Sequence, residues 1–242
     1  MRRAFLLLAL IGLLSLAATG VASAQEPATC LGIPATVTGS GTILGTDGPD
    51  VIVGSTGNDT ILGLGGDDVV CGDLGNDSID GGEGNDLLIG DSSLSLILGQ
   101  NGGMSVPGGN DLISGGNGDD EILGEAGNDV IDGGNGDDFG TGNVGTDVVS
   151  GGTGDDELFG GPGGDTLNGE NGNDFLIGTF GSDVLNGGRG DDLLDGDLPP
   201  QDESGEPVLD PNPNSDTCNG DQGFDIAFGC EALSGIESIF GG

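Results

Sequence analysis

The sequence predicts an all-β fold in which short parallel strands stack into a solenoid, and three observations support this. Glycine makes up 56 of the 242 residues, about three times its usual share. Aspartate recurs every nine residues along most of the chain, with glycine four residues after it and, in all but one repeat, two residues before it. An apolar residue stands two positions after these aspartates, with Gly140 as the clear departure. A fixed short period is typical of repeat architectures.

Residues 1–24 are predicted to be a secretory signal peptide. Arg2 and Arg3 form a charged start, residues 4–18 form an apolar core, and Ala22 to Ala24 provide a small-x-small cleavage site. An uncleaved membrane anchor is the alternative, but the apolar run is short for a membrane span. We therefore expect an extracellular chain that begins at Gln25 and has no segment inserted in a membrane.

The repeats divide the remaining chain into blocks separated by two breaks. In the first break Ser95 and Met104 occupy the aspartate positions, while Ile97 and Val106 keep the apolar spacing, so we expect two degenerate repeats that retain their strands. The expected segments are an N-terminal capping segment (25–45), a first repeat block (46–90), the degenerate repeats (91–108), a second block (109–197), an acidic, proline-rich loop (198–213), and the last repeats with a C-terminal cap (214–242).

Two nine-residue units are expected to form one coil, in the order turn, short strand, turn, short strand. A single unit cannot bury its one apolar side chain alone, whereas stacked coils line these side chains into a thin core between two parallel sheets. The three residues around each apolar position form the strand, and alternation points the middle residue inward. Glycine on either side permits the positive φ angles that such turns require.

Four cysteines in a secreted chain favour two disulfides. They lie two near each end of the repeat region, which leaves three possible connectivities. Local pairing of Cys30 with Cys71 and of Cys218 with Cys230 is favoured, because each bridge would then fasten one end of an elongated body. Free buried thiols are the alternative.

The composition excludes most catalytic and nucleic-acid-binding chemistry. The chain has no His, and its three cations are Arg2, Arg3 and Arg189, against 42 acidic residues and a formal net charge of -39. Without His or Lys the chain has no Ser-His-Asp triad, Schiff base or P-loop lysine. Nucleic acid requires a basic surface. We expect a non-catalytic protein, although paired aspartates can serve glycosidases and Arg189 is the one cation a lyase site could use.

The recurring aspartates predict a row of metal sites. Carboxylates that stack at coil spacing repel one another when ionised, and a hard divalent cation between successive turns turns this repulsion into attraction. Carboxylate and carbonyl oxygens are the ligands that Ca²⁺ prefers, whereas Mg²⁺ demands stricter geometry and the chain lacks the His or thiolate clusters that favour zinc or copper. The candidate ligands are Asp50, Asp59, Asp68, Asp77, Asp86, Asp111, Asp120, Asp129, Asp138, Asp147, Asp156, Asp165, Asp174, Asp183 and Asp192.

Residues 81–89 and 115–123 resemble the G-G-x-G-x-D-x-U-x nonapeptide of the hemolysin-type, or repeats-in-toxin (RTX), calcium-binding proteins. The resemblance covers about residues 45–197 and 214–230. It implies a calcium-bound parallel β-roll in which the aspartate of each repeat and turn carbonyls bind ions between repeats i and i+2. Acids at the second turn position are either additional ligands or solvated surface charge, and they are Asp73, Asp91, Glu125, Glu170 and Asp221.

The sequence thus indicates a secreted, non-catalytic calcium-binding protein that needs several calcium ions in order to fold. Without cations, a glycine- and acid-rich chain of this kind is expected to be disordered. The alternative function is an extracellular adhesion or matrix module that self-associates or docks to a cell-surface or matrix partner through an apolar sheet face. That face would carry Leu123, Phe139, Phe159, Phe175, Ile177 and Leu193. The loop or the C-terminal segment could instead cover it, and an ice-binding solenoid lacks the regular outward threonines that it would need.

Overall fold

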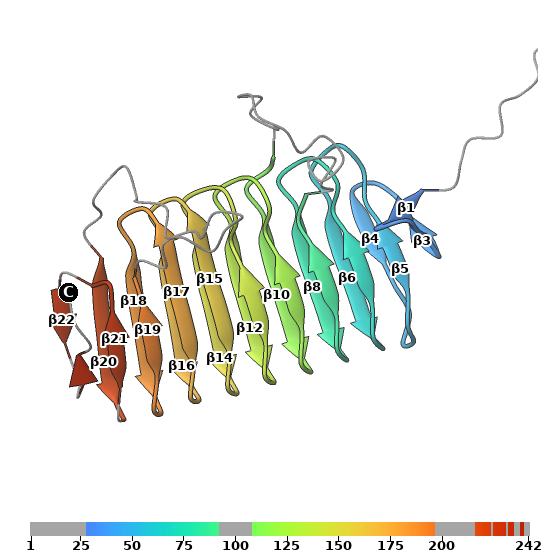
Figure 1. Ribbon diagram of the computed structural model, residues 1–242. Coiled ribbons are helices and arrows are strands. Elements are labelled where there is room, and N and C mark those ends of the chain that lie inside the picture. Colours follow the sequence, from blue (N-terminus) through green and yellow to red (C-terminus); the bar gives the residue numbers. More distant parts are fainter. Residues whose placement is uncertain are drawn as a thin grey trace, which may run out of the picture.

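Two parallel sheets lie face to face and run the length of a rod (Figure 1). This arrangement comes from a computed structural model that describes residues 28–91, 108–196, 216–223, 225–230, 232–234 and 238–239. The predicted signal peptide and the predicted loop 198–213 lie outside the described residues, as do residues 92–107 of the degenerate repeats. The predicted all-β class and parallel β-roll are confirmed.

The two sheets are named here by the numbering of their strands. The even sheet contains β4 (Thr42–Leu44), β6 (Thr60–Gly65), β8 (Ser78–Glu83), β10 (Leu112–Asn117), β12 (Val130–Asn135), β14 (Val148–Thr153), β16 (Thr166–Asn171), β18 (Val184–Arg189), β20 (Thr217–Gln222) and β22 (Ala232–Ser234). The odd sheet contains β3 (Val37–Thr38), β5 (Val51–Val53), β7 (Val69–Cys71), β9 (Leu87–Ile89), β11 (Glu121–Leu123), β13 (Phe139–Thr141), β15 (Glu157–Pro162), β17 (Phe175–Phe180), β19 (Leu193–Asp195), β21 (Ile226–Phe228) and β23 (Ser238–Ile239). No described segment is a helix long and apolar enough to cross a membrane.

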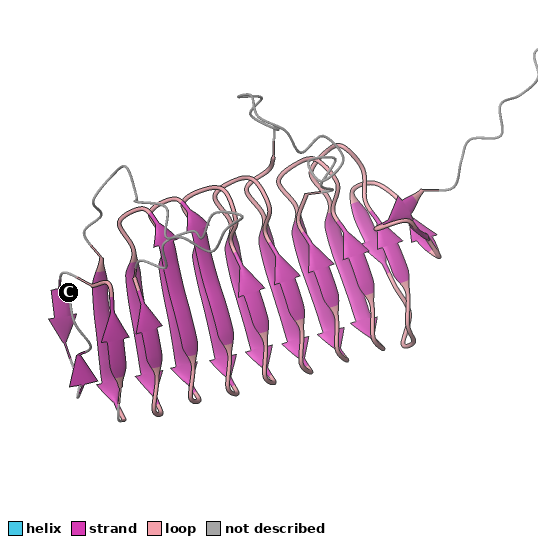
Figure 2. Cartoon of the chain, in the orientation of Figure 1, coloured by secondary structure: helices cyan, strands magenta, loops and turns pink. Residues whose placement is uncertain are grey.

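Each strand pairs in parallel with the equivalent strand of the next coil (Figure 2). Ile113 of β10 lies opposite Ile131 of β12, which in turn lies opposite Val149 of β14. Within a repeat block, equivalent residues are therefore eighteen apart, as the sequence predicts for a coil of two nine-residue units. Consecutive strands in the chain belong to opposite sheets, so each coil contributes one strand to each sheet.

The core is a thin layer of one apolar side chain from each half-coil. Ile61, Ile122 and Leu158 are among the side chains that are almost fully buried between the two sheets. At the departure from this pattern, a Cβ added to Gly140 would lie 3.0 Å from Val149 Cγ1 and 3.3 Å from Leu158 Cδ2, so neighbouring side chains close the gap. Burial of each such side chain contributes about 1.5–3 kcal/mol, but the layer is only one residue wide.

Several strands are longer than the sequence analysis predicts. Three-residue strands are found at β5, β7 and β9, but β10 and β12 extend over six residues and pair through the glycines that follow the apolar position. The positive φ angles expected at the turn glycines are found within these strands, at 114° for Gly116 and 111° for Gly134. The pairing with the adjacent coil nevertheless continues past the apolar position and through these glycines.

The solenoid continues across both breaks in the repeat. β8 pairs directly with β10 and β9 with β11, just as β18 pairs with β20 and β19 with β21. This pairing leaves no place between these strands for additional ones, so the predicted strands around Ile97 and Val106 do not separate the two blocks. At each break the chain leaves and rejoins the solenoid within a turn that leads into an even-sheet strand. One of these turns lies between Asp91 and Gly108, and the other lies between Gly196 and Asp216.

Two disulfides fasten the described ends of the solenoid, with the favoured local pairing. Cys30 is bonded to Cys71 and Cys218 to Cys230, with Cα–Cα distances of 5.7 and 6.0 Å. Cys30 belongs to an antiparallel pair formed by β1 (Thr29–Cys30) and β2 (Ile33–Pro34). Its side chain packs with Val53 and Ile89 against the outer face of the odd sheet. This first part of the outer face is therefore covered.

Glycine at the first position of a repeat is required by close packing, which gives a testable prediction. A Cβ at Gly133 would lie 2.5 Å from Asp138 Oδ2 and 2.6 Å from the Gly151 carbonyl oxygen, whereas a Cβ at Gly48 would meet no atom within 4 Å. We expect Gly133→Ala to destabilise the fold by about 1–3 kcal/mol and Gly48→Ala to be tolerated. Thermal unfolding of both variants in a calcium-containing buffer measures this, and equal melting temperatures would contradict the steric argument.

Candidate metal centre

The predicted site aspartates form two buried rows, one along each edge of the solenoid. The odd edge consists of the turns that lead into odd-sheet strands, and the even edge of those that lead into even-sheet strands. All fifteen predicted aspartates are described, and each exposes no more than 8% of its surface. The row on the odd edge is Asp50, Asp68, Asp86, Asp120, Asp138, Asp156, Asp174, Asp192 and Asp225. The row on the even edge is Asp59, Asp77, Asp111, Asp129, Asp147, Asp165, Asp183 and Asp216.

The two rows are called ladders here, and beyond Asp50 one oxygen of each described ladder carboxylate accepts a hydrogen bond from the backbone of the preceding coil. The Asp120 N–H donates to Asp138 Oδ1 at 2.8 Å, and the Asp138 N–H donates to Asp156 Oδ1 at the same distance. The same bond spans both breaks, since the Asp86 N–H donates to Asp120 Oδ1 at 2.7 Å and the Asp192 N–H donates to Asp225 Oδ1 at 3.0 Å. The two separate blocks of the sequence therefore form continuous ladders in the structure.

The second carboxylate oxygen is buried and receives no hydrogen bond in most of the ladder. Buried polar atoms almost always have a partner, and leaving a charged one without a partner is costly. A repeated orphan oxygen therefore fits a position at which a cation could bind. The aspartates with this buried Oδ2 atom are Asp68, Asp77, Asp86, Asp111, Asp120, Asp129, Asp138, Asp147, Asp156, Asp165, Asp174 and Asp192.

At several turns a backbone carbonyl oxygen of the next coil lies near the same glycine as the orphan carboxylate oxygen. The point where Gly133 would carry a Cβ lies 2.5 Å from Asp138 Oδ2 and 2.6 Å from the Gly151 carbonyl oxygen. The corresponding distances at Gly160 are 2.6 Å to Asp165 Oδ2 and 2.9 Å to the Gly178 carbonyl oxygen. On both edges, a carboxylate oxygen of one coil and a carbonyl oxygen of the next coil therefore lie close to the same glycine.

The donor set is made of oxygen atoms from few side chains. Among the described residues, no three His, Cys, Asp or Glu side chains converge into a group that could hold a metal ion. Any ion in the ladder would therefore need backbone carbonyls in addition to one or two aspartates. Ca²⁺ accepts such a mixed set of six to eight oxygens in flexible geometry, whereas Mg²⁺ requires a stricter octahedron. The residues present fit calcium.

The first two aspartates of the ladders differ from the rest. Asp50 Oδ2 accepts hydrogen bonds from the Thr46 N–H and hydroxyl at 2.8 and 2.9 Å, and the Thr36 hydroxyl lowers the pKa of Asp50. Asp59 Oδ2 accepts equivalent bonds from the Ser55 N–H and hydroxyl at 2.6 and 2.9 Å. In the first full coil, Thr46 and Ser55 therefore supply the donors that the later coils lack.

Acidic residues at the second turn position adopt a backbone conformation that usually requires glycine. Asp73, Glu125, Glu170 and Asp221 all have positive φ angles between 61° and 76°. Asp91 is buried, its Oδ2 accepts a hydrogen bond from the Gly109 N–H at 2.9 Å, and burial raises its pKa to about 7. Asp91 is therefore not a solvated surface charge, although the sequence left that interpretation open for it.

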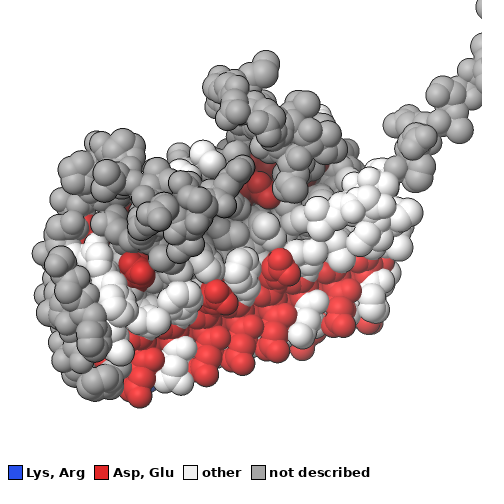
Figure 3. Space-filling model, in the orientation of Figure 1, with Lys and Arg blue, Asp and Glu red and all other residues white. Residues whose placement is uncertain are grey.

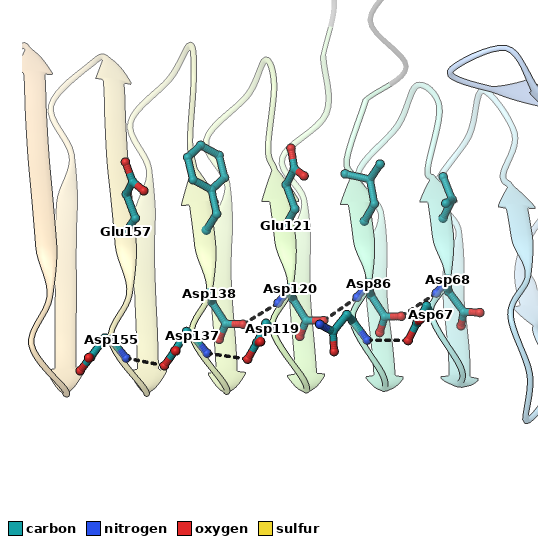
Figure 4. Close-up of a pocket in the computed structure, with 14 residues that line it drawn as sticks. Asp67, Asp68, Asp86, Asp119, Asp120, Glu121, Asp137, Asp138, Asp155 and Glu157 are labelled. Atoms are coloured by element: carbon teal, nitrogen blue, oxygen red, sulfur yellow. Dashed lines mark hydrogen bonds between the residues drawn. The ribbon is translucent and has the colours of Figure 1, made fainter.

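A groove of about 550 Å³ runs beside the odd edge. Its lining includes the buried ladder residues Asp68, Asp86, Asp120 and Asp138 and the exposed acids Asp119, Asp137 and Asp155 (Figure 4). Figure 3 shows the corresponding band of acidic side chains along the lower edge of the rod. The sequence analysis missed this exposed row, because a nine-residue period averages over two edges that differ and only an eighteen-residue period separates them.

In the later coils, several buried ladder carboxyl groups have a raised pKa and therefore bind protons more tightly than ordinary aspartates. Burial raises the pKa of Asp138 to about 6 and that of Asp120 to about 7, with backbone hydrogen bonds opposing the shift and neighbouring carboxylates adding to it. Burial likewise raises the pKa of Asp165 and Asp174 to about 7. The ionised form of the ladder is therefore unfavourable unless a cation compensates it.

These shifts predict opposite pH responses with and without calcium. Because the folded pKa values lie above those of the unfolded chain, the metal-free fold is favoured below about pH 4 and loses stability as the pH rises to about 7. Calcium requires the ionised carboxylates, so its apparent affinity should fall as the pH drops from about 8 to about 5. Far-UV circular dichroism in chelator and calcium titrations at several pH values test both responses; a metal-free β signal that does not change with pH would contradict the first.

One family model matches most of the repeat region. The model is described as RTX calcium-binding nonapeptide repeat (4 copies), and it matches residues 44–79, 72–93, 108–139, 141–176 and 168–198. These matches include the aspartate ladders from Asp50 to Asp192. No curated protein matches the chain.

Proposed function

The chain belongs to the RTX calcium-binding nonapeptide repeat family, and from this premise we propose that it is a secreted, non-catalytic protein that calcium ions fold into its β-roll. The observation that carries the proposal is the row of buried Oδ2 atoms that receive no hydrogen bond, as at Asp120, Asp138 and Asp156. Calcium ions would bind between successive coils, which is the spacing at which these oxygens recur.

The proposed ligands are the fifteen predicted ladder aspartates together with turn carbonyls. At Asp138, for example, Oδ1 stays on the Asp120 N–H while Oδ2 and the Gly151 carbonyl oxygen face the same glycine. A bound calcium ion would supply the positive charge that these oxygens lack. At Asp50 and Asp59 an ion would have to replace the hydrogen bonds from Thr46 and Ser55. Asp216 and Asp225 extend the two rows and are added to the proposal.

Folding is proposed to depend on calcium because the charge exceeds what the core can offset. The chain carries 42 acidic residues against three basic ones. Two ladder carboxylates one coil apart, about 4.8 Å, repel by roughly 3–4 kcal/mol at an effective dielectric constant of 20. This repulsion between neighbours is similar to, or larger than, the gain from the single apolar side chain that each half-coil buries. Ion binding and folding would then be one event.

The extracellular and non-catalytic parts of the proposal depend on composition. The predicted signal peptide at residues 1–24 and two disulfides fit an oxidising compartment. Arg189 is the one cation among the described residues, and it lies exposed at the end of β18. Apart from Asp and Glu carboxylates, that part of the chain has no His, Lys or Tyr side chain that could act as a general base, and it has no cluster of cations, so a structural, ion-dependent role is the proposed one.

A calcium titration of the mature chain, starting at Gln25, tests the proposal. We expect a cooperative gain of β signal in far-UV circular dichroism and, by calorimetry, several bound ions. Asp138→Asn keeps an oxygen for the Asp120 N–H but removes the charge, so it should bind fewer ions and fold at higher calcium. Glu157→Gln, an exposed change on the outer face of the odd sheet, is the control and should behave like the wild type. A full β signal in chelator at neutral pH would refute calcium-dependent folding.

The outer face of the odd sheet supports a second candidate function, docking to another copy or an extracellular partner. Phe139, Phe159 and Phe175 lie on this face, with ring centroids 5.4 and 6.4 Å apart, and all three are partly exposed. They extend the apolar cluster that the N-terminal cap covers, which ends at Leu123. Partly exposed aromatic side chains in a continuous row are typical of interaction surfaces.

Serine substitutions test this second function. If the face docks to another copy, Phe159→Ser combined with Phe175→Ser should lower the sedimentation coefficient of the calcium-bound protein and leave calcium binding intact. The matched control is Val130→Ser with Val148→Ser, two exposed valines on the outer face of the even sheet. An unchanged sedimentation profile for the phenylalanine variant would count against self-association.

A further inference from the structure

The two edges of the solenoid carry different residues at the position just before each ladder aspartate. On the odd edge this position is acidic in five coils, at Asp67, Asp119, Asp137, Asp155 and Asp191. All five side chains are exposed. On the even edge the described residues at this position are uncharged, and four of them are Asn58, Asn76, Asn110 and Asn128.

The charge of the odd row is not needed for the local structure. The Asp137 N–H donates to Asp119 Oδ1 at 3.0 Å, and in the same way the Asn128 N–H donates to Asn110 Oδ1 at 2.8 Å. The odd edge also makes this bond with an amide, since the Asp191 N–H donates to Asn173 Oδ1 at 3.0 Å. An asparagine therefore does the structural work of the aspartate, and the additional negative charge must have another consequence.

The exposed carboxylates act electrostatically on the buried ladder beside them. Figure 4 shows Asp119 and Asp137 along the turns, next to Asp120 and Asp138. Asp119 and Asp137 directly precede Asp120 and Asp138 in the chain, and Asp155 directly precedes Asp156, so each exposed charge lies one residue from a ladder aspartate. Negative charge at this distance attracts a calcium ion, which carries two positive charges.

The even edge has a second disadvantage. Both breaks interrupt turns of this edge, between Asp91 and Gly108 and between Gly196 and Asp216, whereas the odd-edge turns run without interruption from Asp50 to Asp192. An interrupted turn must bring its two halves together before its carbonyls and its aspartate can act jointly, and closing a longer loop costs more entropy.

From these two differences we infer that the solenoid has two classes of calcium sites, and that the odd edge binds more tightly and fills first. This inference rests on the proposed function and adds an order of filling to it. The exposed aspartates of the odd edge attract the ion through their negative charge and do not have to contact it. Because they are exposed, their effect should weaken as salt screens them.

Calorimetric calcium titrations of matched double variants test the inference on the mature chain. Asp137→Asn with Asp155→Asn removes two charges from the odd edge, and Asn110→Asp with Asn128→Asp adds two to the even edge. The control, Glu121→Gln with Glu157→Gln, removes two exposed charges from the outer face of the odd sheet. Asn and Asp side chains both accept a hydrogen bond from the N–H of the adjacent coil at these positions, so the four edge substitutions can keep these bonds. Circular dichroism at saturating calcium verifies that each variant folds.

We expect two phases in the wild-type titration. The odd-edge variant should weaken the tight phase about three- to tenfold without changing the number of ions, and the even-edge variant should tighten the weak phase by a similar factor. The face variant should change neither by more than about twofold. A single phase, or equal effects of edge and face variants, would overturn the inference while leaving calcium binding intact. A complete absence of calcium binding would instead refute the proposed function.

Discussion

The structure depends on one constraint, the stacking of ionisable carboxyl groups at the spacing of adjacent coils. Beyond the first coil, a ladder aspartate places one oxygen on a backbone N–H of the preceding coil and turns the other into a buried space beside a glycine, as Asp138 does. The hydrogen bond fixes the position of the charge, and burial prevents water from solvating it. Ionised aspartates in this position are unfavourable without a compensating cation, which is the basis of the proposed calcium dependence.

The thin core explains why this electrostatic demand dominates. One apolar side chain per half-coil lies between the sheets, and among the described residues the second apolar cluster is confined to the outer face near the N-terminal disulfide. Larger domains offset buried charge with a wide apolar interior, whereas here the ladder and the core have the same number of members. The protein can interrupt its turns between Asp91 and Gly108 and still continue both ladders, because strand pairing and the aspartate bonds act between coils and not along the chain.

The two edges use one backbone geometry for different electrostatic surroundings. Asparagine and aspartate make the same bond to the next coil, so exchanging them changes the local field without disturbing the turn. In the first full coil, Thr46 and Ser55 donate hydrogen bonds to the second oxygens of Asp50 and Asp59, which the later coils leave without a donor. Short polar residues within a repeat therefore change the surroundings of its ladder aspartate without changing the turn.

The sequence by itself determined the half-coil, the inward apolar position, the parallel solenoid, the ladder aspartates and the favoured disulfides, because each follows from a nine-residue period or from the placement of four cysteines. The tertiary structure decided which repeats are neighbours. Ile97 and Val106 keep the apolar spacing of a strand, yet β8 pairs with β10 and β9 with β11. The local sequence pattern does not specify which strands become neighbours. Only the stacking of the coils shows that Asp119, Asp137 and Asp155 lie on one edge. Contacts between coils, formed by residues eighteen or more positions apart in the chain, determine both the strand pairing and the residues that share an edge.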